Sequence, residues 1–323
     1  MRLFCLLAVF FTIAGFSQAV NAADKVSICY GSTSSALLAI AKEQGFIKAE
    51  GLDVELIPYT SGKNSIQAML DGKCSLSTTA QTPVVHHSFS RNDFLILTNL
   101  SVSDDFEKIL VRIDKGINKP SDMRGHSIAL PQFATQHYLL DIFLVANSLK
   151  LNDVKRVYLH HNEVLKVFRS GEVDAIVHRE PEVSIMMKEF AGKAKIMPTS
   201  GLCVSAYMLV GRKDFVAKNP ASITKLLRAL VRAEDFAIRE PVKAKAIAAR
   251  VYGGSQADME MIWSFHNYRI SLEQSLMFIL ENMARWEIEQ MPASQKKPMP
   301  NYLDFIYFDG LKSVRPEAVK IIR

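Results

Sequence analysis

One strand-loop-helix unit occurs twice in this 323-residue chain, about one hundred residues apart, and this repeat restricts the fold more than any other feature. In the first copy, residues 26–30 read as a buried strand, residues 31–35 as a Gly-Ser-Thr-Ser-Ser loop, and Leu37, Ile40 and Ala41 as one face of a helix. In the second copy, the strand is 127–130, the loop 131–134, and the helix begins near Thr135. A repeat of this period predicts two similar structural units.

The helix of the second copy predicts a binding position. We expect Thr135 as its N-cap, with Tyr138, Leu139, Ile142, Phe143 and Ala146 forming the face that packs on the sheet. Its first turn then lies at the carboxyl end of the strand, where free N–H groups and the positive end of the helix dipole favour a small anion or polar group. The alternative is an ordinary strand-to-helix connection, which is common.

The elements that follow each copy also correspond. Residues 52–57 and 151–157 each read as a strand entered through Asp-Val, and residues 69–79 and 168–178 each read as a helix end, a glycine turn and a buried strand. Pro83 and Pro181 come soon after. The sequence therefore predicts an α/β protein with two β-α-β-α-β lobes.

The amino terminus has the pattern of a secretory signal peptide. Arg2 precedes an apolar run at 3–15, and small residues follow toward Ala22. We expect cleavage after Ala22, or alternatively after Ala19, and a periplasmic protein without a lipid anchor, since no cysteine stands at the junction. No later stretch is apolar enough to predict a membrane helix.

Charge and cysteine content exclude several functions. The formal net charge of +6 falls to +5 without Arg2, and the scattered basic residues do not form the patch that nucleic-acid binding requires. Cys29, Cys74 and Cys203 remain after cleavage. Their spacing fits no metal motif, and we interpret them as small buried residues without predicting a disulfide. We expect no metal and no cofactor.

Some three hundred mature residues exceed one ordinary core, so we predict two lobes. Lobe 1 comprises 23–108 and 208–323, with a helical carboxyl-terminal tail, and lobe 2 comprises 109–207. The chain crosses between the lobes through strands at 106–113 and 204–212. Tail helices are predicted at 219–239, 241–251, 255–266 and 273–290.

Two lobes joined by two crossings form a hinge, and ligands bind beyond the carboxyl ends of parallel strands. The facing loops are 31–35, 59–62 and 79–82 in lobe 1, and 131–137, 160–162 and 178–181 in lobe 2. The candidate ligand-binding residues are Ser32, Thr33, Ser34, Gln81, Thr82, Gln132, Thr135, Gln136, His137, Arg179 and Glu180.

Several motifs resemble the periplasmic substrate-binding proteins of ABC importers for nitrate, taurine and alkanesulfonates. They are Ala41-Lys-Glu-Gln-Gly-Phe-Ile-Lys-Ala-Glu-Gly-Leu-Asp-Val, Lys119-Pro-Ser-Asp-Met-Arg-Gly, Ser170-Gly-Glu-Val-Asp-Ala, and the ending Leu311-Lys-Ser-Val-Arg-Pro-Glu-Ala-Val. The resemblance implies a two-lobed type II periplasmic-binding-protein fold. It further implies a monomer that delivers a small sulfonate, taurine, nitrate-like or pyrimidine-type solute to permease subunits in the inner membrane.

This sequence departs from the family at Arg179-Glu180, where many relatives have an aromatic residue before the proline. Arg179 is a candidate for an acidic ligand group and Glu180 for an amine or amidine-like ring edge. The alternative is that the two side chains pair with each other.

Two other functions remain open. One is an enzyme similar to the synthases that build the thiamine pyrimidine. Their histidine run and cysteine-rich motif are missing here, and the adjacent pairs His86-His87 and His160-His161 form no catalytic pattern. The other is a sensory binding protein that presents its bound form to a receptor, a function that needs the same cleft.

Overall fold

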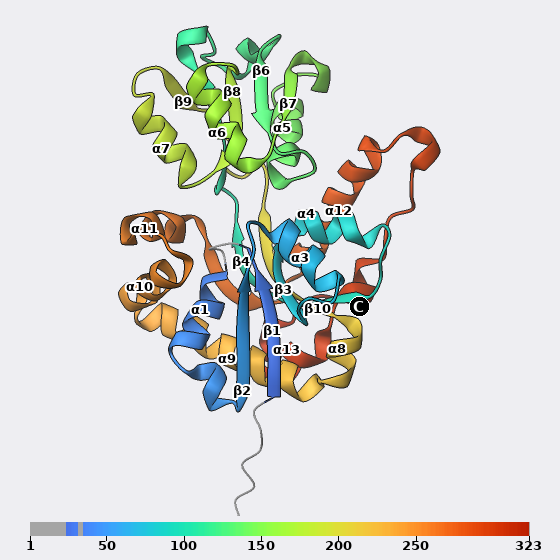
Figure 1. The fold of residues 1–323 in the computed structure, drawn as a ribbon. Helices are drawn as coiled ribbons and strands as arrows, with labels where there is room; N and C mark the ends of the chain where they lie inside the picture. Colours follow the sequence, from blue (N-terminus) through green and yellow to red (C-terminus); the bar gives the residue numbers. More distant parts are fainter. Residues whose placement is uncertain (1–23, 32–34, 323) are drawn as a thin grey trace, which may run out of the picture.

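The computed structural model describes residues 24–31 and 35–322, and the expected signal peptide lies outside these ranges. The described residues form two lobes, each around its own sheet (Figure 1). Lobe 1 contains a six-stranded sheet of order β11-β4-β10-β3-β1-β2. Its strands are β1 (Asp24–Tyr30), β2 (Leu52–Pro58), β3 (Leu76–Ala80), β4 (Phe94–Ser103), β10 (Ser205–Arg212) and β11 (Asn267–Ser271).

In lobe 1, β1 pairs in parallel with β2 and β3, whereas β10 runs antiparallel to β3 and β4. Its helices are α1 (Ala36–Glu43), α2 (Phe46–Ala49), α3 (Gly62–Leu70), α4 (Gln81–Ser88), α8 (Lys213–Lys218), α9 (Pro220–Arg239), α10 (Pro241–Tyr252), α11 (Gln256–Phe265), α12 (Gln274–Gln290) and α13 (Phe308–Val314). The four predicted tail helices are confirmed as α9 to α12, because Asn-Pro, Glu-Pro and Ser255 mark helix starts clearly.

Lobe 2 contains a five-stranded sheet of order β7-β6-β8-β5-β9. Its strands are β5 (Glu107–Arg112), β6 (Ser127–Leu130), β7 (Lys155–Tyr158), β8 (Ala175–Arg179) and β9 (Ala194–Ile196), and its helices are α5 (Thr135–Ala146), α6 (His161–Ser170) and α7 (Glu182–Glu189). Successive residues of a strand point to opposite faces of this sheet. Ile128 and Leu130 pack in the cluster that contains α5 residues, whereas Ala129 packs in the cluster that contains α6 and α7 residues. Helices therefore cover both faces of the sheet.

The repeat seen in the sequence is present as matching hydrogen bonds. In lobe 1 the Ser75 N–H donates to Ser27 Oγ at 3.1 Å, and in lobe 2 the Asp174 N–H donates to Ser127 Oγ at 3.2 Å. Each pair joins the first strand of the repeat, β1 or β6, to the turn before its third strand, β3 or β8. The duplication predicted from residues 69–79 and 168–178 is therefore confirmed in the backbone.

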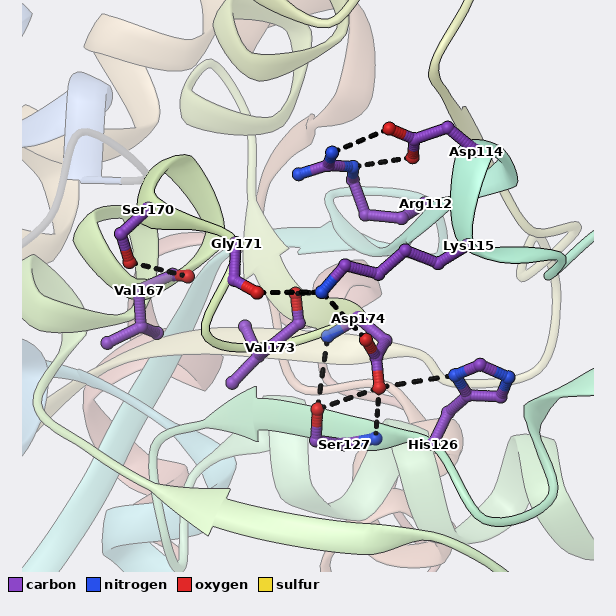
Figure 2. A network of polar contacts seen from close by, with 10 residues as sticks. All are labelled: Arg112, Asp114, Lys115, His126, Ser127, Val167, Ser170, Gly171, Val173 and Asp174. Atoms are coloured by element: carbon purple, nitrogen blue, oxygen red, sulfur yellow. Dashed lines mark hydrogen bonds and ion pairs between the residues drawn. The ribbon is translucent and has the colours of Figure 1, made fainter.

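Asp174 is the centre of a larger polar network in lobe 2, at the amino ends of β6 and β8 (Figure 2). Its carboxylate accepts from the Ser127 N–H and Oγ, both at 2.9 Å, and pairs with Lys115 at 2.9 Å and His126 at 3.2 Å. Burial would raise the pKa of Asp174, but these hydrogen bonds hold it well below its usual range. The network fixes β6 against β8.

Cys29 and Cys74 form a disulfide, which the sequence analysis left open, because β1 and the turn before β3 bring their Cα atoms to 6.0 Å, and Cys203 is the free cysteine among the described residues. Two local expectations were wrong. The N-cap of α5 is Ala134, and Thr135 is already helical. The buried face of α5 consists of Leu139, Leu140, Phe143 and Leu144, so it is rotated from the predicted face, and Ala146 is exposed.

The predicted crossing strands are β5 and β10, each paired within one sheet. The chain changes lobes in the connections before them, at 104–106 and 197–204, a few residues earlier than the divisions at 108/109 and 207/208. We place the division of the lobes at these two connections, which run side by side in Figure 1.

Candidate functional site

A cleft of about 1010 Å³ lies between the two lobes. Its lobe 1 wall is formed by residues 60–64 and 78–80, with Ser35, Thr82 and Pro83. Its lobe 2 wall is formed by residues 131–136 and 158–163, with Leu165, His178, Arg179 and Glu182. Two further lining residues, Glu107 and Tyr207, come from β5 and β10. This volume is at the upper end of the range for small-molecule sites in proteins.

The lobe 1 wall is held by short contacts between loops. Ser61 caps α3 by accepting from the Asn64 N–H at 3.3 Å, and Thr79 Oγ1 donates to the Gly62 carbonyl at 3.0 Å. Gly31, at the end of β1, lies so close to this loop that a Cβ there would stand 2.2 Å from the Ser61 carbonyl carbon. Only glycine fits this approach.

The lobe 2 wall is built from the starts of α5 and α6. His160 precedes α6, and its N–H donates to Glu163 Oε2 at 3.1 Å. Gln132, Thr135 and Gln136 line the cleft at the start of α5. The first N–H groups of each helix have no acceptor within the helix, so both starts favour a negatively charged or polar group.

Glu107 lies on the floor of the cleft and is 8% exposed. Gln136 Nε2 donates to its Oε2 at 2.6 Å, and Arg179 is its register partner on β8. Burial raises the pKa of Glu107 from 4.5 to about 7, against the opposing effects of the Arg179 charge and the Gln136 hydrogen bond. The Arg179 guanidinium is directed instead to Glu182 Oε1, at 3.8 Å.

Two histidines in the cleft are uncharged at neutral pH. Burial lowers the pKa of His161 to about 3 and also lowers that of His178, with the Arg179 charge acting in the same direction. His178 Nε2 donates to the His161 carbonyl at 3.2 Å, whereas the Nδ1 atoms of both rings are buried without a hydrogen-bond partner. These neutral rings offer hydrogen bonds rather than positive charge.

Polar contacts join the lobes beside the cleft. Thr82 Oγ1 lies 3.1 Å from Thr135 Oγ1. Asp141 of α5 accepts from Trp286 Nε1 of α12 at 2.9 Å and from Arg156 Nη2 at 2.7 Å. Helix α12 of lobe 1 therefore contacts α5 of lobe 2.

The structure places five of the predicted residues in the cleft lining: Thr82, Gln132, Thr135, Gln136 and Arg179. Ser32, Thr33 and Ser34 lie outside the described residues. Gln81, His137 and Glu180 are buried and do not line the cleft.

Internal hydrogen bonds explain why these last three side chains are unavailable. Gln81 Oε1 accepts from the Ala206 N–H at 3.0 Å, His137 Nε2 bonds Tyr158 Oη at 3.1 Å, and Glu180 Oε2 accepts from the Ser184 N–H at 3.0 Å. The alternative that Arg179 pairs with Glu180 is also wrong, because its partner is Glu182.

Sequence reasoning missed Glu107, Tyr207 and Glu182. Glu107 and Tyr207 lie near the amino ends of β5 and β10, which run antiparallel to β8 and β3. The amino end of an antiparallel strand meets the carboxyl ends of its neighbours, so the crossing strands themselves were the signal that could have located both residues.

The described residues contain no group of three or more His, Cys, Asp or Glu side chains arranged to hold a metal ion. In the same part of the chain, no helix has the length and apolar character needed to cross a membrane.

Comparisons with known proteins agree with this architecture. The model of the NMT1/THI5-like family matches residues 32–244. The taurine-binding periplasmic protein of Escherichia coli is 24% identical over 241 residues, covering 73% of this chain and 72% of that protein. A 4-amino-5-hydroxymethyl-2-methylpyrimidine phosphate synthase of Saccharomyces cerevisiae is 23% identical over 229 residues, covering 64% of each.

Among solved structures, the alkanesulfonate-binding protein of Xanthomonas axonopodis pv. citri bound to MOPS superposes with a TM-score of 0.71 at 17% identity, covering 88% of this chain and 98% of that one. The periplasmic aliphatic sulphonate binding protein of Escherichia coli gives 0.72 at 17% identity, covering 88% and 97%. The predicted two-lobed periplasmic-binding-protein fold is confirmed by these similarities.

Proposed function

The chain belongs to the NMT1/THI5-like family, and from its cleft we propose that it is the solute-binding component of an ABC importer. The observation that carries this proposal is the cleft itself, whose walls come from helix starts and strand ends of both lobes. A solute held there contacts both lobes at once, so binding favours the closed form. A membrane permease could distinguish that form from the open one.

The solute is a small polar or anionic organic molecule of the sulfonate, taurine, nitrate-like or pyrimidine type. Each helix start contributes about 0.3–1 kcal/mol toward a negative group. Micromolar binding needs about 8 kcal/mol, so contacts from both walls and burial of apolar atoms must combine. The polar contacts come from Thr82, Gln132, Thr135, Gln136 and Arg179.

The side chains of the cleft support binding rather than catalysis. His161 and His178 have lowered pKa values, and neither ring forms a hydrogen bond to a Ser, Thr, Cys or Lys side chain of the described residues. The Cys203 thiol is buried outside the lining, and burial raises its pKa to about 12, which disfavours the reactive thiolate. The similarity to yeast synthases keeps an enzyme as the alternative to be tested by turnover.

The location and partners belong to the same proposal. Cleavage of residues 1–22 would release the mature protein into the periplasm as a monomer, with permease subunits of the inner membrane as its partners. A receptor of a sensory pathway is the alternative partner.

A thermal-shift screen of the chain from Ala23 tests this function. The panel contains nitrate, taurine, alkane- and arylsulfonates, aromatic carboxylates and pyrimidine amines, and the protein is first denatured and refolded to remove any solute from the cells. We expect a saturable rise in melting temperature for one class, with the compound recovered unchanged. Conversion of the compound to a product would instead establish an enzyme, and no shift together with no solute in the denatured extract would refute a binding function.

A further inference from the structure

Glu107 is a buried carboxyl group with an unfilled hydrogen-bonding position. Gln136 Nε2 donates a hydrogen bond to Oε2, whereas no described residue donates one to Oε1. No Lys, Arg or His nitrogen of the described residues forms an ion pair with Glu107 within 4.0 Å, because Arg179 is directed to Glu182. Oε1 is also not among the fully buried unpaired atoms, so it faces the cleft that Glu107 lines.

A buried carboxylate lowers the stability of the fold unless a cation or hydrogen-bond donors pair with it. Buried carboxylates in proteins are normally paired with a cation or with several donors. Here the rest of the fold supplies one amide donor, whereas the buried Glu234 of lobe 1, for example, accepts from Arg315 at 2.8 Å and from the Ile270 N–H at 2.8 Å. The cleft that Glu107 lines is the side from which a further donor can reach its carboxylate.

We propose that the solute carries an amine or amidine-type N–H group that donates to Glu107 Oε1. The inference rests on the proposed binding function and narrows its ligand to molecules with both an N–H donor and a polar or acidic end. The acidic end lies toward the starts of α5 and α6, where Thr135 and His161 line the same cleft.

Arg179 supports this division of the cleft into two ends. It stands opposite Glu107 in the β5–β8 register, its side chain is 29% exposed, and its ion pair with Glu182 is long, at 3.8 Å. A guanidinium held this loosely can turn to the acidic group of a ligand, whereas the Glu107 carboxylate repels that group. A simple anion such as ethanesulfonate would therefore leave Glu107 unpaired, and a zwitterion of the same size would satisfy both side chains.

Matched pairs of ligands test the inference on the unmodified protein. Calorimetric titrations compare taurine with ethanesulfonate, β-alanine with propionate, and 4-aminopyrimidine with pyrimidine. We expect the amino compound of the pair that binds to be favoured at least about tenfold, because loss of a hydrogen bond to a charged group costs about 1.5–3 kcal/mol.

Variants then connect this preference to Glu107. Glu107→Gln keeps the shape and the contact to Gln136, and should reduce the preference to less than about threefold. Glu189→Gln is the control, since Glu189 is paired with Arg169 on the surface outside the cleft lining and should leave the preference unchanged. Equal binding within every pair, or an unchanged preference in Glu107→Gln, would overturn the inference and leave the binding function standing. Absence of binding in both members of all pairs, with no N–H-bearing solute in the denatured extract, would overturn the inference and count against the binding function too.

Discussion

Replacing Glu107 by glutamine should make the ligand-free protein more stable at neutral and alkaline pH. Burial raises the pKa of Glu107 from 4.5 to about 7, so folding disfavours its ionised form. At about 1.36 kcal/mol for each pKa unit, this difference corresponds to about 3 kcal/mol, which is the largest stabilisation that the neutral amide could give. Residues needed for ligand binding often reduce stability in this way.

The pH dependence of the free energy of unfolding determines where the Glu107→Gln variant is more stable than the original protein. Because the pKa is higher in the folded protein than in the unfolded chain, the folded state binds more protons between pH 4.5 and about 7. The contribution of Glu107 to stability is therefore fully present below pH 4.5, and is lost as the pH rises through about 7. Glutamine does not titrate, so the variant should match the original protein near pH 4.5 and exceed it above about 7.

The other groups that face Glu107 do not add to the pH-dependent difference in stability between the two proteins. They are Gln136 of α5, Arg179 of β8, Glu182 of α7, Tyr207 of β10 and Cys203. The pKa of Tyr207 is raised well above its usual value and that of Cys203 to about 12, so neither ionises in this range. Glu107 is not among the causes that lower the pKa of His161 or of His178, so the difference between the two stability curves isolates Glu107.

Urea unfolding near pH 5 and near pH 8 measures this difference. Glu234→Gln is the matched control, since Glu234 is also buried, at 7% exposure, but is paired with Arg315 at 2.8 Å. The control should lose about 1.5–3 kcal/mol near pH 8, because its hydrogen bond to the Arg315 guanidinium loses one of the two charges, although Arg315 keeps its contact to Asp235 Oδ1 at 3.0 Å. A Glu107→Gln variant that is less stable than the original protein near pH 8, or whose advantage does not shrink near pH 5, would refute the account of Glu107 as an unpaired carboxylate.

Three further predictions concern contacts that shape the lobes. Reducing the Cys29–Cys74 disulfide, which spans 45 residues, should lower the free energy of unfolding by about 2–4 kcal/mol in urea titrations, whereas Cys203→Ser with the disulfide intact should not reproduce this loss. Asp141→Asn should weaken the contact of α12 with lobe 2 by about 1.5–3 kcal/mol and alter the fluorescence of Trp286, and an unchanged emission spectrum would contradict that contact. Gly31→Ala should lower the urea midpoint by the equivalent of about 1–3 kcal/mol through its clash with the next loop, whereas Gly254→Ala, with open space around its Cβ, should be nearly neutral.

The sequence predicted the fold well because its elements obey local rules. The paired serine contacts at Ser27 and Ser127 follow from a repeat that is visible in the residues, and the tail helices begin at proline and serine signals that depend on no distant contact. The disulfide was missed for the opposite reason. Whether two buried cysteines meet depends on the register of β1 against β3, which residue spacing alone does not give.

The candidate site was predicted at the level of loops but less well at the level of side chains. A strand followed by a helix places its loop at the cleft, whatever the loop sequence, and so residues 131–136 were located correctly. The direction of each side chain depends on the neighbours it meets. His137 is one residue beyond Gln136, yet it is buried, bonds Tyr158 Oη and does not line the cleft.

Glu107 shows which part of a site such reasoning misses. Its strand follows the connection between the lobes and runs antiparallel to β8, so the residue that begins β5 stands beside Arg179, which ends β8. Polar residues in loops suggested a cleft suited to anions, whereas the buried carboxyl group of Glu107, which has one amide donor, changes the expected ligand from an anion to a molecule that also carries an N–H donor. In two-lobed proteins of this architecture, ligand selectivity is therefore to be sought at the starts of the crossing strands as well as in the loops that follow the parallel ones.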